Sequence, residues 1–113
     1  MLASSARLRA ATEIRHVIRS GRRARAGLLT LHYATLPSRV DQPCAAAFVV
    51  PKKVGTAVAR NTVTRRLRHA LRDRLLTLRP GSALVVRVAP GAAELSFAEL
   101  AASLDDGLAR VAR

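Results

Sequence analysis

The feature that most limits the fold of this chain is a long helical pattern, residues 57–78, with a strand-like apolar run on either side. The runs are Cys44–Val50 and Ala83–Ala89, and Pro80 with Gly81 separates the helix from the second of them. Projected at about 100° per residue, the apolar residues of the helix gather on one side. They are Val63, Leu67, Ala70, Leu71 and Leu78. A buried helix between two strands predicts a fold that mixes α and β structure.

The remaining segments extend this pattern to both ends of the chain. Thr12–Ser20 has helical spacing, and Leu28–Leu36 has the alternation of a strand, with Arg22–Ala26 as one further short strand. Ser96 and Glu99 have the spacing of a capping box and begin a closing helix. The apolar face of that helix is Leu100, Leu104, Leu108 and Val111. The order predicts an α+β fold with one small sheet, and 113 residues are enough for a single domain spanning 1–113.

Charge defines the class of partner. Twenty Lys and Arg residues against seven Asp and Glu give a net charge of +13, and half of the residues are hydrophobic, so the chain is expected to fold. A polyanion, above all a nucleic acid, explains why so small a domain tolerates this self-repulsion. The longest apolar run, Cys44–Val50, is too short to cross a bilayer, and Arg7 and Arg9 lie where a signal peptide would be apolar. We therefore expect a cytoplasmic protein without a membrane partner.

The long helix also carries a polar stripe, apart from its buried side. Its members follow one another at spacings of 4, 3 and 4, which are Asn61, Arg65, Arg68 and Arg72. Lys52 and Lys53, the only lysines of the chain, come just before the helix. Guanidinium and ammonium groups at the start and along one line of a helix suit phosphate oxygens. An exposed helix face in an arginine-rich chain is also often basic from composition alone.

Catalytic and metal-binding patterns are weak. Asp105 and Asp106 are the only adjacent acids and fit a solvated helix face, and Cys44 fits a buried strand. The three histidines are scattered, so we predict neither catalytic residues nor a metal site. His32 alternates with apolar neighbours and should face outward, either exposed or in contact with RNA. Phe48 is one of only three aromatic residues and, from the residues alone, fits the core.

The stretch PKKVGTAVARNTVTRRLRHALR, residues 51–72, resembles the signature segment of the bacterial ribonuclease P protein component. RLRAATEIRHVIRSGRRARAGLLTLHY and APGAAELSFAELAASL are similar to the segments that open and close that family, so the resemblance covers nearly the whole chain. It implies a protein subunit that binds a catalytic RNA and the 5′ leader of precursor tRNA, while the RNA cleaves the leader with bound Mg²⁺. It also implies the order α-β-β-β-α-β-α with a left-handed parallel crossover, and no DNA partner.

The resemblance assigns roles residue by residue. The basic motif that would contact the catalytic RNA consists of Lys52, Lys53, Arg60, Asn61, Arg65, Arg66 and Arg68, and the stripe adds Arg72. The cleft for the leader would contain Ile14, Ile18, His32, Phe48 and Arg87. Thr62 and Thr64 stand where the family usually has Arg and Lys, which removes two charges and should flatten the salt dependence of binding. Ile14, Ile18 and His32 replace customary aromatic residues, which leaves fewer stacking faces in the cleft.

Two other classes of protein remain as alternatives. A ribosomal or nonspecific RNA-binding protein of similar fold would bind many structured RNAs with comparable strength. A stand-alone nuclease would cleave RNA without an RNA partner. A helix-turn-helix DNA-binding protein is disfavoured because strands, not a second short helix, precede the basic helix.

Overall fold

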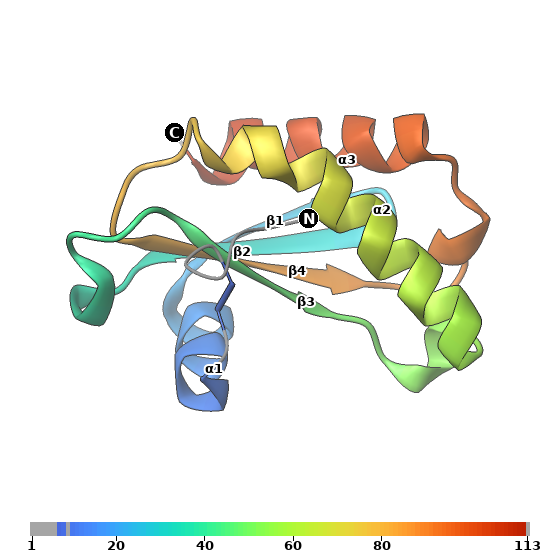
Figure 1. Ribbon diagram of the computed structural model, residues 1–113, viewed down its shortest axis with the longest axis horizontal. Helices are drawn as coiled ribbons and strands as arrows, with labels where there is room; N and C mark the ends of the chain where they lie inside the picture. Colours follow the sequence, from blue (N-terminus) through green and yellow to red (C-terminus); the bar gives the residue numbers. More distant parts are fainter. Residues whose placement is uncertain (1–6, 9, 113) are drawn as a thin grey trace.

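A four-stranded sheet carries one helix on one face and two on the other (Figure 1). The computed structural model describes residues 7–8 and 10–112. The helices are α1 (Ala11–Ser20), α2 (Ala57–Leu75) and α3 (Phe97–Val111). The strands are β1 (Arg22–Ala26), β2 (Leu29–Thr35), β3 (Ala45–Val49) and β4 (Ser82–Val88). Three short 3-10 turns are η2 (Pro37–Arg39), η3 (Lys52–Val54) and η4 (Ala92–Glu94).

The strand order is β1-β2-β4-β3, so the chain returns to the middle of the sheet with its last strand. β2 pairs antiparallel with β1 and β4, whereas β3 and β4 are parallel and are joined through α2. This confirms the predicted α+β class and the α-β-β-β-α-β-α order. The predicted helix 57–78 is three residues too long, because α2 ends at Leu75 and a turn leads to Pro80. No helix in the described part of the chain is long and apolar enough to cross a membrane.

The sheet separates two cores. The larger core lies under α2 and α3, and its largest fully buried side chains are Leu29, Leu31, Leu67, Leu71, Leu84, Leu100 and Leu104. The smaller core lies under α1, where Val17 packs on Ala45, Ala83 and Val85. Alternation along β2 and β4 sends successive side chains to the two cores, and α1 lies across only part of its face (Figure 1). The rest of that face is left for polar residues.

The expectation that His32 faces outward is wrong. The strand alternation does turn His32 away from Leu31, but its cross-strand neighbour Val85 belongs to the core under α1, and the imidazole is only 2% exposed. Burial, followed by the nearby guanidiniums of Arg87 and Arg23, lowers the pKa of His32. The imidazole is therefore part of the packing on this face, because α1 covers a strand face that the sequence pattern leaves open.

α3 is stabilised by a cap at its N-terminus and by a close approach to β2. The predicted capping box is confirmed, since the Ser96 amide donates to Glu99 Oε1 at 2.9 Å and the Glu99 amide donates to Ser96 Oγ at 3.1 Å. At Gly107 a Cβ atom would lie 2.8 Å from Leu31 Cδ2, so the glycine allows the helix backbone to approach the sheet. The cap thus defines where α3 begins, and the glycine lets it pack closely on β2.

Candidate nucleic-acid interface

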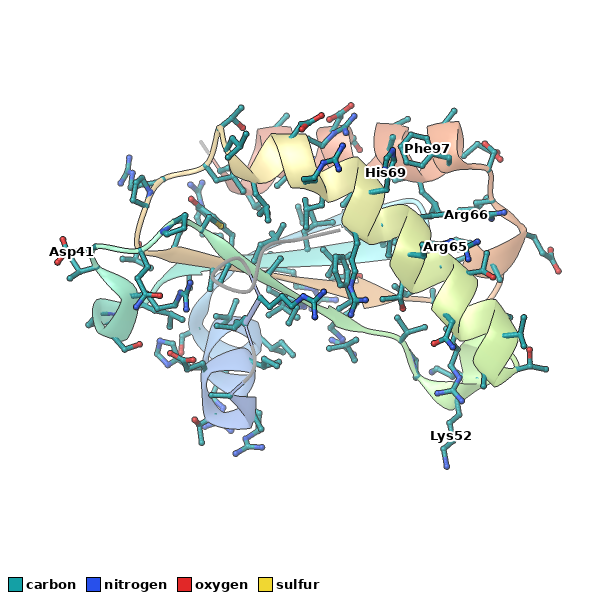
Figure 2. All side chains as sticks on the ribbon, viewed as in Figure 1. Asp41, Lys52, Arg65, Arg66, His69 and Phe97 are labelled. Atoms are coloured by element: carbon teal, nitrogen blue, oxygen red, sulfur yellow. The ribbon has the colours of Figure 1, made fainter. Side chains whose placement is uncertain are left out.

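The interface begins at the end of β3, where the Lys pair leads into α2. Lys52 and Lys53 are both exposed within η3, and Figure 2 shows Lys52 extending from this corner of the molecule. Gly55 follows with φ at 153°, a conformation that favours glycine. Thr56 then caps α2, because its Oγ1 accepts from the Ala59 amide at 3.1 Å. The junction thus places two ammonium groups beside a helix N-terminus, whose partial positive charge also favours anions.

The predicted polar stripe is present on α2, and we call Asn61, Arg65, Arg68 and Arg72 the basic row. Asn61, Arg65 and Arg72 are exposed and Arg68 is half-buried, on the side of the helix away from Leu67. Arg72 lies 3.8 Å from the carboxylate of Asp73, whereas Arg65 and Arg68 have no carboxylate partner among the described residues. The basic row is therefore a line of donors suited to a phosphate backbone.

Two arginines of the predicted motif lie off the basic row. Arg66 turns toward α3, where its Nη1 donates to the carbonyls of Leu95 at 2.8 Å and Ala93 at 3.3 Å. Arg60 is half-buried, and its buried Nε has no hydrogen-bond partner. The predicted basic motif therefore also has a structural part, because Arg66 holds the segment before α3 in place. The side chains of the basic row lie outside these contacts.

The two threonines that replace the customary Arg and Lys bond within α2. Thr62 Oγ1 donates to the Val58 carbonyl and Thr64 Oγ1 donates to the Arg60 carbonyl, each at 2.9 Å. Their hydroxyl hydrogens are thus used inside the helix. Thr62 and Thr64 therefore add no charged donor beside the basic row.

The residues predicted for a leader cleft are distributed over both faces of the sheet. Ile14 and Ile18 pack on the core under α1, whereas Phe48 packs on the core under α2 and α3. Ile14 and Phe48 nevertheless meet at the edge of β3, where both line a hollow of about 310 Å³. Arg87 is exposed on the α1 side of the sheet, outside the lining of that hollow, and His32 is buried. Of the five residues predicted for the leader cleft, the structure therefore brings Ile14 and Phe48 together in this hollow.

One basic residue that sequence reasoning missed, Arg7, lies at this hollow. Arg7 lines the hollow together with Arg68, because the Leu8 amide donates to the Ala46 carbonyl at 2.8 Å and ties the start of the chain to the edge of β3. This bridge lies outside any regular element, so no periodicity announces it.

Arg23 and Arg25 are exposed on the same sheet face as Arg87. The register places Arg25 opposite Thr30, which in turn lies opposite Arg87. In the sequence, these arginines alternate with alanines in β1, which indicates that they share one face of a strand. Only the strand order shows that this face is also the face of Arg87. Three guanidiniums on one partly uncovered sheet face add a second basic surface on the α1 side.

The acids of α3 are occupied by structural interactions. Arg74 forms a two-point pair with Asp105, from Nε at 2.5 Å and from Nη2 at 3.0 Å, and this hydrogen bonding lowers the pKa of Asp105. Arg110 pairs with Asp106 at 3.1 Å. Within residues 7–8 and 10–112 no group of three or more His, Cys, Asp or Glu side chains could hold a metal ion. The pair with Arg74 joins α3 to α2, whereas the pair of Asp106 with Arg110 lies within α3.

Exposed basic side chains on a small mixed sheet define a class of α+β protein whose surface is suited to a polyanion. Residues 2–112 match the family model described as Ribonuclease P, and the chain belongs to that family. A ribonuclease P protein component of Streptomyces avermitilis is 44% identical over 117 residues, covering 98% of this chain and 95% of that protein. One of Nocardioides sp. is 47% identical over 112 residues, with 98% and 95% covered. The chain is thus the accessory protein subunit of an endoribonuclease that processes tRNA 5′ ends.

Solved structures agree with the fold. The RNase P protein of Staphylococcus aureus superposes with a TM-score of 0.81 at 17% identity, covering 96% of this chain and 98% of that one. The RNase P protein of Thermotoga maritima gives 0.74 at 19% identity, with 88% and 92% covered. The same arrangement of sheet and helices is therefore compatible with widely different sequences.

Proposed function

We propose that the chain binds the catalytic RNA of ribonuclease P through the basic row of α2 and the Lys pair that precedes it. The observation that carries this proposal is the geometry of the row, in which exposed Arg65 and half-buried Arg68 lack carboxylate partners among the described residues. Guanidinium forks fix the register of a folded RNA, and the more mobile ammonium groups of Lys52 and Lys53 add charge at the junction. Arg66 offers only part of its guanidinium to this interface, because its Nη1 donates to the backbone carbonyls of Ala93 and Leu95.

The 5′ leader of precursor tRNA takes the surface on the α1 side of the sheet. Arg23, Arg25 and Arg87 supply exposed guanidiniums there, and the hollow between Ile14 and Phe48 opens at the edge of the same sheet. A single strand binds such a surface through its phosphates and through stacking of its bases on apolar or aromatic side chains. Phe48 is the one aromatic residue in the lining of this hollow, so stacking contributes less than in a cleft with several rings.

Mg²⁺ belongs to the RNA in this proposal. The acids of α3 pair with Arg74 and Arg110, and the described residues offer no cluster of metal ligands. The protein contributes by neutralising phosphates, which lowers the Mg²⁺ concentration that the folded RNA and its substrate need. We also propose that this reaction takes place in the cytoplasm.

Equilibrium binding tests this assignment. The chain should bind the catalytic RNA more tightly than an unrelated structured RNA of equal length, measured at the same salt and Mg²⁺ concentrations. The assembled complex should bind precursor tRNA more tightly than mature tRNA. Comparable affinity for all structured RNAs would instead support a nonspecific RNA-binding protein.

A further inference from the structure

A pair of rings lies on the outer surface beside the basic row, where α2 passes α3 (Figure 2). The ring centroids of His69 and Phe97 are 5.3 Å apart, and the ring planes are tilted by 60°. Both side chains are exposed, Phe97 to 41%, whereas the other two aromatic side chains, Tyr33 and Phe48, are half-buried against the core. The packing of the core therefore does not account for the position of Phe97.

The ring pair is held in place by its surroundings. Phe97 is the first residue of α3, directly after the Ser96–Glu99 capping box. Arg66, three residues before His69 on α2, donates to the Leu95 carbonyl and ties the preceding segment to the same helix. These two contacts position the start of α3, and with it the backbone of Phe97, beside α2 before any ligand arrives, which lowers the entropic cost of binding one.

The ring pair is continuous with the basic row. His69 follows Arg65 by four residues and precedes Arg72 by three, so the three side chains are neighbours on the helix surface. Asp73 also neighbours His69, at a spacing of four, and lies 3.8 Å from Arg72. Arg68, at the other flank of the row, lines the hollow beside β3. The rings and the hollow therefore lie on opposite flanks of the same line of guanidiniums.

We propose that the His69–Phe97 pair stacks an unpaired base of the catalytic RNA whose phosphates follow the basic row. This inference rests on the proposed function and adds a contact to it. Every base has a π-face, so a ring accepts any base that is free to turn outward, as in a loop or a bulge. An apolar protein segment fits this place less well, because Arg65 and Arg72 beside the rings call for an anion.

The substitution Phe97→Leu tests the proposal, since leucine retains apolar bulk but has no π-face. Affinity for the catalytic RNA should fall by about fivefold or more, which corresponds to the lower end of the energy of stacking one base. The salt dependence should not change, because stacking releases no counterions. Unchanged affinity, with an unchanged melting temperature as proof of folding, would overturn the proposal.

A direct readout is available because the chain contains no tryptophan. Phe97→Trp introduces a single fluorophore, and its emission should be quenched in a saturable manner as the catalytic RNA is added. Val40→Trp, at a position that is 68% exposed in the loop after η2, is the matched control and should not respond. Full emission from Phe97→Trp in the bound complex would refute stacking. Failure of the proposed function would give a different result: the substitutions Arg65→Ala and Arg68→Ala would then leave the salt dependence of RNA binding unchanged.

Discussion

Replacing Arg65 and Arg68 together with alanine should flatten the salt dependence of binding to the catalytic RNA. Each phosphate contact contributes about 0.7–0.9 to the slope of log K against log salt concentration, so loss of two contacts lowers the slope by about 1.4–1.8. Over a fourfold rise in salt, the wild-type chain should then lose about tenfold more affinity than the double variant does. The assay is a filter-binding or fluorescence titration of the catalytic RNA at several salt concentrations and constant Mg²⁺.

A matched control removes the same charge elsewhere. Arg15 and Arg19 are exposed on α1 and lie outside the basic row, so the substitutions Arg15→Ala and Arg19→Ala change net charge equally. The control should retain most of the slope. An equal fall in both double variants would mean that net charge, and not the position of the row, determines binding. An unchanged slope in the Arg65 and Arg68 variant would refute the idea that this stripe meets phosphate.

Three further predictions concern stability. Gly107→Ala should lower the free energy of unfolding, measured by urea titration, by roughly 1–2 kcal/mol, because overpacking against Leu31 outweighs the gain in helix propensity. A variant as stable as the wild-type chain, or more stable, would contradict the close approach of α3 to β2. Folding lowers the pKa of His32, so at pH below the unfolded value of 6.5 the unfolded chain binds more protons than the folded chain. The free energy of unfolding should therefore be constant with respect to this group well above pH 6.5 and should decrease as the pH falls below it. The variant His32→Leu should lack this decrease. Asp105→Asn should cost up to about 1 kcal/mol near neutral pH, because the pair with Arg74 is partly exposed, and thermal melts that show no loss would argue against it.

Local patterns in the sequence were sufficient to predict the elements that carry the site. The apolar side of α2, the Ser96–Glu99 capping box and the three main strands follow from periodicity and cap chemistry, so they could be located without coordinates. The basic row also follows, since four polar side chains at helical spacing must share a face wherever the helix packs. The end of α2 was misplaced because Leu78 continues the apolar pattern past the last helical turn.

Packing between elements determined what the sequence could not show. His32 was expected to face outward because alternation along β2 identifies a face but not the helix that covers it. The hydrogen bonds from Arg66 to the carbonyls of Leu95 and Ala93 could not be foreseen, because these partners lie far away in sequence. The pairing of His69 with Phe97 likewise depends on how α3 lies beside α2, which no local pattern encodes.

The most direct test of the account is cleavage of a leader-bearing precursor tRNA at low Mg²⁺ by the cognate catalytic RNA, with and without the chain. We predict strong stimulation by the wild-type chain, weaker stimulation by the Arg65 and Arg68 double variant at elevated salt, and no cleavage by the chain alone. Absence of stimulation despite tight RNA binding would contradict the account and favour a nonspecific RNA-binding protein. Cleavage by the chain alone would contradict the assignment of hydrolysis to the RNA.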